Sequence, residues 1–432
     1  MATGGLAVIR DNLFYIGGAK ETAWGTPVAP TWFHRWLDST DADGAIQYGS
    51  EREGDTSPYL SLIYKSGQYW AFKVVEYARP QIAGYALQGL LGSGSDTYTA
   101  PTKTSTVGAA GILAGATTFP SVVDLGNTGT GALNFDPGYS NPLYETQTVD
   151  YTTRSGAGTP WTYTLAGGAK FTNAHAAAST INSASSHVLT CQPYGFDPYS
   201  YEFGWGAAAA AISGAIRMTD AVCTGLTISG QHGQPIRFES DWLAASAKEL
   251  TALQSPTYEG TNVVGAAGGP LVWHQGNTWN INGATTGNAA TIQQFALQLK
   301  RSTTWDDLQT ELITPSGFLP GNIDISGQFS VAFVNWAQYS NMYFANTTFT
   351  NNAVDSYLVG YESLLLRWAS DAVNSFQINL PRINYTAAKL SPKLDGKALK
   401  QPISFTASKP PPGATFSDAV IFTLLNSNNA AY

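Results

Sequence analysis

Charge and cysteine are both scarce in this chain. Charged residues make up 12% of its 432 residues, roughly half the usual share of a soluble protein. Two cysteines, Cys191 and Cys223, are too few for a disulfide scaffold or a four-thiolate metal site. They form either one bridge or two buried thiols, and buried thiols fit better with the absence of an export signal after Met1. The five histidines are scattered, so we expect no metal and no cofactor.

The short motifs of common enzyme classes are also missing. The chain has no Gly-x-Ser-x-Gly nucleophile elbow and no Gly-Lys-Ser or Gly-Lys-Thr phosphate loop. Carboxylates gather at Glu51, Glu53 and Asp55 and again at Asp306 and Asp307, in polar loops where charges are usually solvated. We therefore do not expect an enzyme.

The charge balance argues against a nucleic-acid-binding protein. With 22 Lys and Arg against 30 Asp and Glu, the formal net charge is −8, whereas phosphate recognition needs clustered cations. An acidic surface would instead let DNA slide past without sticking. No apolar run is long enough to span a bilayer, and we expect no membrane contact.

Apolar–polar alternation predicts a chain rich in β-structure. The runs 59–65 and 68–75 flank Ser66-Gly67 and predict a hairpin with a tight turn there. A helix is expected to follow Pro80 and to stop at Gly92. Clean alternation returns at 295–300 and 323–333, followed by a possible helix at 335–344.

A repeated pattern indicates that one unit occurs twice. Gln-Pro-Ile-x-Phe stands at 234–238 and at 401–405, each preceded by an arginine, Arg217 or Arg382. Because the first copy lies much farther from its predicted helix, the first unit must hold an insertion. We predict these boundaries: an N-terminal arm at 1–40, a first unit at 41–245 with an insertion at about 97–186, a linker at 246–290 and a second unit at 291–432.

Five short motifs, in their order along the chain, resemble the tail tube proteins of long-tailed, non-contractile bacteriophages. They are Glu-Thr-Ala-Trp-Gly-Thr-Pro-Val-Ala-Pro at 21–30, Glu-Arg-Glu-Gly-Asp at 51–55, the hairpin and helix ending at Leu91-Gly92, Gly-Leu-Thr-Ile-Ser-Gly at 225–230 and Asn-Leu-Pro-Arg-Ile at 379–383. The resemblance implies a mainly β fold of two tandem β-sandwich or barrel units, each with a short α-helix, plus a β or loop insertion in the first.

The resemblance also implies a function and a location. Such a protein would self-assemble into stacked rings that form a hollow tail tube, through which DNA passes without specific binding. It would belong to the virion, after synthesis in the host cytoplasm, and would contact the tape measure, tail terminator and distal tail proteins. Two units per chain predict homotrimeric rings with pseudo-sixfold symmetry, with hexameric rings as the alternative.

Low charge and many aromatic residues are typical of large obligate interfaces. Candidate residues facing the lumen are carboxylates on the polar faces of predicted strands: Glu239, Asp241 and Asp324. Candidate contacts between subunits or rings are Trp24, Trp32, Phe33, Trp36, Glu51, Glu53 and Asp55. The exterior of the tube is the alternative location for the three strand carboxylates.

Two other functions are compatible with the sequence. With 12 Trp and 22 Tyr, the chain has aromatic rings to stack on sugars, as a secreted carbohydrate-binding or carbohydrate-cleaving β-protein would. A tail-fibre or capsid decoration protein is the third alternative. Self-assembly into rings separates the tail tube from both.

Overall fold

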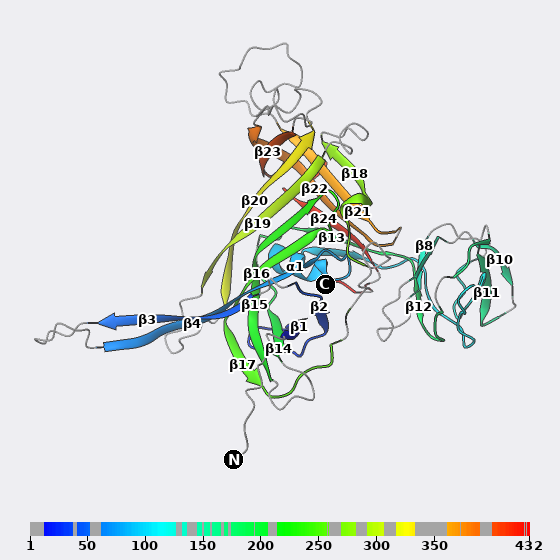
Figure 1. The fold of residues 1–432 in the computed structure, drawn as a ribbon, viewed down its shortest axis with the longest axis horizontal. Coiled ribbons are helices and arrows are strands. Elements are labelled where there is room, and N and C mark those ends of the chain that lie inside the picture. The colour runs from blue at the N-terminus through cyan, green and yellow to red at the C-terminus, as the bar shows by residue number, and fades with distance from the viewer. Residues whose placement is uncertain are drawn as a thin grey trace, which may run out of the picture.

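The computed structural model is a mainly β protein with one large antiparallel sheet, two small sheets and one α-helix among the residues it describes (Figure 1). The described residues are 13–37, 41–51, 62–126, 132–135, 145–148, 151–155, 158–165, 168–171, 174–193, 195–205, 214–256, 258, 269–281, 292–305, 317–332, 361–371, 373–388, 400–426, 428 and 430–432.

The large sheet contains most of the strands. They are β1 Leu13–Lys20, β2 Trp32–His34, β3 Asp41–Glu51, β4 Leu62–Tyr77, β5 Asp96–Thr99, β13 Ser185–Thr190, β14 Tyr199–Trp205, β15 Gly214–Gln231, β16 Arg237–Ala244, β17 Ser246–Leu250, β18 Gly276–Ile281, β19 Ile292–Trp305, β20 Phe318–Ala332, β21 Glu362–Ala369, β22 Ser375–Ala388, β23 Lys400–Ala407 and β24 Ile421–Asn426. A 3₁₀ turn, η2 Trp273–Gln275, precedes β18.

Eight of these strands form a continuous wall in which one order occurs twice. The first set is β3-β4-β16-β15 and the second is β19-β20-β23-β22, all paired antiparallel. In each set a hairpin comes first, then the strand that carries the phenylalanine of the Gln-Pro-Ile-x-Phe pattern, then the strand that precedes this pattern in the sequence. The sets join where β15 pairs with β19, from Gly225 opposite Lys300 to Gln231 opposite Gln294.

The two copies of the sequence pattern occupy matching positions in this wall. Phe238 lies opposite Ile228 in the first set, and Phe405 lies opposite Tyr385 in the second. Two residues further along each pattern strand, the partners are Leu226 and Ile383. The shared sequence pattern is therefore accompanied by a shared register.

The wall branches at both ends instead of closing on itself. The first half of β15 turns away to pair with β14 and β17, and β14 continues to β1 and β2. The first half of β22 pairs with β21 and β24, and β24 continues to β13 and β5. Within the described residues the sheet forms no closed barrel, so a barrel within this chain, one of the two architectures expected, is wrong.

One large core fills the body behind the wall. Strand β16 shows why: its residues alternate strictly between half-buried and buried, so one face carries Phe238 and Trp242 into the core. The core includes side chains from both four-strand sets and from the branches. Long period-two alternation thus gives a sheet with one apolar and one polar face.

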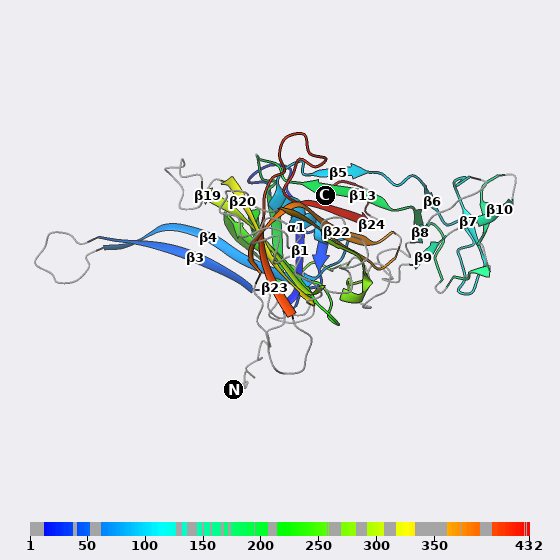
Figure 2. The same cartoon turned by 90° about the horizontal axis from the view of Figure 1, so that it is seen from above.

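The hairpin predicted inside 59–75 is wrong, because β4 runs without interruption from Leu62 to Tyr77. Its partner is β3, and the register shifts where Gln47 and Tyr48 face Gly67 and Lys65. Ser66-Gly67 therefore marks a bulge within a strand, a common role of glycine in β-structure. The β3–β4 hairpin extends well away from the body in two perpendicular views (Figures 1 and 2).

The predicted helix is present as α1, Ala83–Leu91, and it ends at Gly92, whose φ of 104° favours glycine. It is buried on almost every side instead of being amphipathic, with Tyr85 as its one partly exposed residue. The second predicted helix, 335–344, lies outside the described residues.

Gly84 of α1 gives a first testable prediction. A methyl group at this position would overlap the ring of Tyr432, whose hydroxyl donates a 2.9 Å hydrogen bond to the Pro80 carbonyl. Alanine usually stabilises a helix relative to glycine by about 1 kcal/mol, but here we expect Gly84→Ala to lower the free energy of unfolding by about 1–3 kcal/mol through overpacking. Chemical denaturation measures the change.

A second substitution tests whether overlap with the Tyr432 ring causes the destabilisation. In a Tyr432→Ser background the obstructing ring is gone, so Gly84→Ala should become neutral or stabilising. Destabilisation of the same size in both backgrounds would show that the Tyr432 ring is not responsible.

A small lobe lies apart from the wall and has its own core. Its sheets contain β7 Thr118–Ser121, β10 Tyr151–Ser155 and β11 Trp161–Leu165, and β6 Thr104–Thr106, β8 Ala132–Phe135, β9 Glu145–Thr148 and β12 Thr180–Asn182. Phe119, Phe135, Tyr163 and Phe171 form the centre of its separate hydrophobic cluster. The lobe lies within the predicted insertion and on the opposite side of the body from the β3–β4 hairpin (Figures 1 and 2).

Two segments expected to be irregular contribute strands. The arm at 1–40 supplies β1 and β2, and the predicted linker at 246–290 supplies β17 and β18. These segments form strands because they pair with strands far away in the sequence: β1 lies against β14, and β18 lies against β21. The outer boundaries of the two units stay predictions.

Candidate assembly interface

The polar face of the wall is formed by the side chains that alternate with those of the core. A shallow hollow of about 470 Å³ lies on this face over the second set, with Thr227 of β15 at its edge. Its lining is uncharged: Thr227, Ala296, Leu297, Gln298, Ser326, Gly327, Gln328, Thr386, Ser404, Phe405 and Thr406. Hydroxyl and amide groups can hydrogen-bond to water here without attracting or repelling a phosphate strongly.

The three carboxylates predicted to face a lumen lie on this face, each beside a cation. Lys73 Nζ is 3.7 Å from Glu239 Oε2 and 3.6 Å from Asp241 Oδ1. Arg237 Nε is 2.8 Å from Glu239 Oε1. Asp324 is exposed and stands in register opposite Lys300. The charges of the face are therefore largely balanced.

The uncharged residues of the hollow were not among the sequence candidates, although their strands were predicted. The sequence contains a signal, because Ser, Thr or Gln occupies several alternate positions of these strands, such as 294 and 298 in β19, 326, 328 and 330 in β20, and 404 and 406 in β23. Ser, Thr and Gln side chains do not ionise near neutral pH, so a pattern of charged residues does not reveal this hollow.

The aromatic contact candidates separate into buried and exposed residues. Trp32 and Phe33 are buried in this chain's own core, where Trp32 stacks on Tyr85 with ring centroids 3.7 Å apart. Trp36 is half-buried against the same core, and Trp24 is 37% exposed. Of the four, Trp24 is thus the most accessible to a neighbour. Glu51 ends β3, and Glu53 and Asp55 lie outside the described residues.

A buried carboxyl holds the loop that carries Trp24. Glu21 Oε1 accepts hydrogen bonds from Ser200 Oγ at 2.6 Å and from the Asp220 backbone N–H at 3.1 Å. Asp220 in turn accepts a 2.6 Å bond from the Gly25 backbone N–H. Burial is the main cause that raises the pKa of Glu21 from 4.5 to about 7, and the neighbouring Asp220 carboxylate adds to the shift.

This raised pKa predicts a pH-dependent stability. Between about pH 4.5 and 7 the folded chain holds a proton that the unfolded chain has lost, so stability falls as the pH rises through this range. Glu21→Gln cannot ionise and should remove that fall, leaving the variant more stable than the parent at pH 8 by about 1–3 kcal/mol, since one pKa unit is worth about 1.4 kcal/mol. Urea denaturation at pH 4 and pH 8 measures it. If the variant and the parent differed in stability by the same amount at pH 4 and at pH 8, Glu21 would not be the source of the pH dependence.

Both outer edges of the wall are unpaired among the described strands. At one end β3 pairs only with β4. At the other end, Ile383 of β22 still faces Glu362 of β21, but no described strand pairs with the outer edge beyond it. Asn384, on this edge, has a buried side-chain oxygen without a hydrogen-bond partner among the described residues. Unpaired edges are surfaces on which another strand can add.

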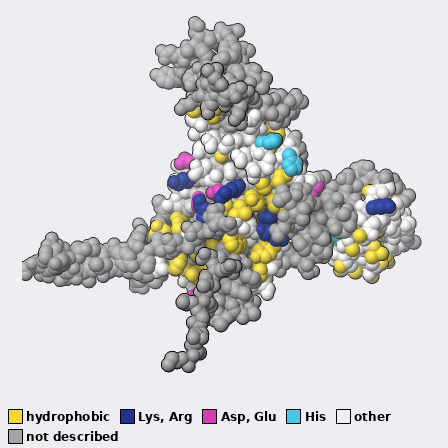
Figure 3. Space-filling view, viewed as in Figure 1, with side chains coloured by type: hydrophobic (Ala, Val, Ile, Leu, Met, Phe, Trp, Pro, Cys, Tyr) yellow, Lys and Arg dark blue, Asp and Glu magenta, His cyan; other side chains and the backbone are white. Residues whose placement is uncertain are grey.

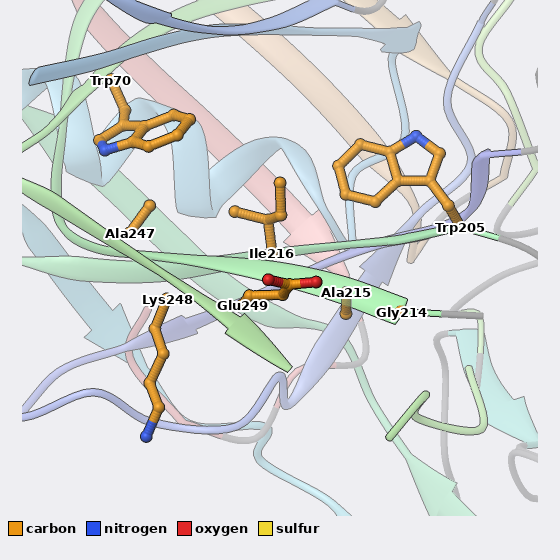
Figure 4. A pocket seen from close by; sticks show the side chains of 8 residues that line it. All are labelled: Trp70, Trp205, Gly214, Ala215, Ile216, Ala247, Lys248 and Glu249. Carbon is orange, nitrogen blue, oxygen red and sulfur yellow. The ribbon is translucent and has the colours of Figure 1, made fainter. Parts of the chain in front are cut away.

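A first apolar hollow of about 420 Å³ lies at the base of the β3–β4 hairpin (Figure 4). Trp70 and Trp205 stand on its two sides, with Ile216 and Ala247 between them, while the ammonium group of Lys248 points away.

A second and larger hollow of about 710 Å³ lies over β18, β21 and β22, and we call it the aromatic groove. It contains two exposed rings, Tyr361 at 44% and Phe416 at 42%. Elsewhere, on the face seen in Figure 3, hydrophobic side chains gather on the body between the lobe and the β3–β4 hairpin, with Lys and Arg beside them. Such patches are typical of contact surfaces.

The described residues offer little reactive chemistry. Cys191 and Cys223 are free thiols, and burial is the main cause that raises the pKa of each. No three His, Cys, Asp or Glu side chains in the described ranges are grouped as a metal site. No helix within those ranges is both long enough and apolar enough to cross a membrane.

No protein-family model matches the chain, and no curated protein has a significantly similar sequence.

Proposed function

We propose that this protein is a structural subunit of a phage tail tube, in which copies join side by side into rings that stack around a passage for DNA. The observation that carries the proposal is the repeated four-strand order with an internal junction between β15 and β19. Each set would be one tail-tube unit, so three chains would supply the six units of a ring. The chain would act as a virion protein without catalysis or a cofactor.

The internal junction supplies a template for the contact between copies. Asn384 corresponds to Thr227, because each faces the residue directly after the phenylalanine of its pattern strand. Leu37, whose N–H bonds to the Val75 carbonyl, corresponds to Gln298. Thr227 faces Gln298 inside the chain, so Asn384 of one copy would face Leu37 of the next. Repeating this contact would remove both open edges of the wall.

The polar face fits the wall of a DNA passage. The hollow over its second set is uncharged, and its described charged residues stand beside opposite charges. DNA binding requires unbalanced cations that release counterions, and among the described side chains of this face each of Lys73, Arg237 and Lys300 stands beside a carboxylate. The lumen would then be lined mainly by Ser, Thr and Gln, with Glu239, Asp241 and Asp324 as paired charges instead of a repelling ring.

The number of copies per ring tests the proposal. Purified protein should form rings or tubes by negative-stain electron microscopy, with three chains per ring by native mass spectrometry. Six chains per ring would contradict the pairing of two units per chain. A stable monomer at high concentration, with or without glycan binding, would contradict the tail-tube function itself.

A further inference from the structure

The aromatic groove has chemical properties that suit a peptide partner. It lies on the outer side of β21 and β22, and its lining combines rings, prolines, amides and one guanidinium. The lining residues that matter most here are Tyr361, Asn379, Pro381, Arg382, Pro410 and Phe416. The Arg382 guanidinium lies 3.4 Å from the centre of the Tyr361 ring and so supplies a positive charge at the rim. Asn280 is buried, and its side-chain oxygen has no hydrogen-bond partner in the described part of the chain.

The first four-strand set contains a counterpart of this groove, and there it is filled. Val222 of β15 and Ala245, just after β16, lie on the side of the wall opposite the main core, in a small cluster of their own. Phe318, the first residue of β20, is buried in this cluster and is 4% exposed. The filling side chain thus comes from the hairpin of the second set, β19–β20.

Arg301 of the same hairpin hydrogen-bonds to backbone carbonyls outside the second set. Arg301 Nη1 donates a 2.8 Å hydrogen bond to the Leu90 carbonyl at the end of α1, and Nη2 donates a 3.0 Å bond to the Gln192 carbonyl. Its guanidinium also lies 4.7 Å from the centre of the Phe196 ring, which belongs to the small cluster. Strand pairing in the internal junction is therefore accompanied by docking of the neighbouring hairpin.

A comparison of the two sets shows that the small cluster and the aromatic groove lie at similar positions. Phe238 and Phe405 correspond, and Leu243, which packs on the small cluster, is as far along the chain from Phe238 as Pro410, three residues after β23 ends, is from Phe405. The region of β15 around Val222 likewise corresponds to β22 near Asn379 to Pro381. Both regions lie on the non-core side of the sheet. The groove therefore occupies the position that β19–β20 covers in the first set.

The hairpin that corresponds to β19–β20 is β3–β4, since each is the first pair of its set. Within one chain β3–β4 extends away from the body and cannot reach β22 (Figures 1 and 2). Its two strands carry charges of both signs, with Asp41, Asp43 and Glu51 on β3 and Lys65, Lys73 and Glu76 on β4.

We propose that the aromatic groove is the docking site for the β3–β4 hairpin of a second copy of this chain. The inference rests on the proposed ring, and it specifies which surface of one subunit receives which element of the next. The hairpin would cover Tyr361 and Phe416 and lie across the end of β22, as β19–β20 lies across the end of β15.

Site-specific photocrosslinking tests the contact directly. Phe416 is replaced by benzoylphenylalanine, which preserves an aromatic ring, and assembled full-length protein is irradiated and digested for mass spectrometry. The expected product joins residue 416 of one chain to a peptide within residues 41–77 of another. Rings that form but crosslink elsewhere, or not at all between chains, would overturn the groove contact and leave the tube function standing. Absence of any assembly by the unmodified protein would overturn the tube function itself.

Matched substitutions test how much the aromatic groove contributes to ring assembly. Phe416→Asp should weaken ring formation about tenfold or more, because a central aromatic anchor contributes above 1.4 kcal/mol in typical interfaces. Val123→Asp, at a 50% exposed position on the lobe, is the control and should assemble as the parent does. Thermal unfolding of each variant verifies that the fold is kept. Equal assembly by both folded variants would refute the docking site.

Discussion

Replacing Trp242 with alanine is expected to lower the free energy of unfolding by about 3–5 kcal/mol, the usual range for a buried tryptophan. The side chain is 1% exposed and lies at the centre of the main core. Its ring contacts Tyr201 and Tyr199, with centroids 4.7 and 5.5 Å away, and the Phe72 ring stacks parallel to it at 6.0 Å. Truncation would leave a cavity between β4, β14 and β16.

The loss should exceed that of an ordinary large-to-small change because a hydrogen bond is lost as well. Trp242 Nε1 donates a 2.9 Å bond to Ser240 Oγ within the buried face of β16. Trp242→Phe keeps most of the packing but not this donor, and should cost roughly half as much. Urea denaturation of the parent and both variants gives the comparison.

Trp161 in the lobe provides the control, because it is only half-buried and is covered by the Arg154 guanidinium at 4.2 Å. We expect Trp161→Ala to change the stability of the body by less than about 1 kcal/mol. A body as sensitive to Trp161 as to Trp242 would mean that the two hydrophobic clusters do not fold as separate units.

A pair of cysteines across the predicted contact should produce covalently closed rings. Asn384→Cys on β22 and Leu37→Cys before β3 would lie opposite each other between copies, by analogy with Thr227 and Gln298. Facing residues of antiparallel strands have Cβ atoms about 5 Å apart, within reach of a short bismaleimide linker. Denaturing electrophoresis of crosslinked assemblies should show dimers and trimers of the chain, with the closed trimer as the end product.

Each single-cysteine variant controls for the native thiols, since Cys223 is buried and Cys191 is half-buried. Neither variant should give species larger than a dimer. A ladder that continues to six chains would indicate hexameric rings, and random crosslinks of similar yield in the single variants would exclude the predicted register.

Alternation along the chain predicted individual strands well, but it did not predict their partners. The runs at 295–300 and 323–333 predict β19 and β20 because one face of each strand packs on the core, and that requirement acts on every second residue. The pairing of β15 with β19, and of β1 with β14, depends on contacts between distant segments that no local pattern encodes. Ser66-Gly67 shows the same limit, since a bulge and a tight turn favour the same residues.

The candidate site was predicted in part for a similar reason. Glu239, Asp241 and Asp324 were placed correctly on polar strand faces, but the neighbouring Lys73 and Lys300 come from other strands. Trp32 and Phe33 looked like contacts because the segment around them seemed irregular, whereas β1 and β2 carry it into the core. An aromatic residue in sequence indicates burial, but not which chain buries it.

The chain enters the lobe and returns from it at adjacent positions. The lobe could therefore be deleted or replaced without disturbing the strands of the body. Lys103 and Ser183 face each other at its entrance, where the Ser183 N–H bonds to the Lys103 carbonyl at 2.9 Å. Directly below them β5 pairs with β13, with Thr99 opposite Ser186. A chain cut at both points would have adjacent ends that a two-residue turn can join. A genome could therefore gain, lose or exchange the lobe in a single step without altering the register of the wall, and foreign sequences could be displayed at the same junction.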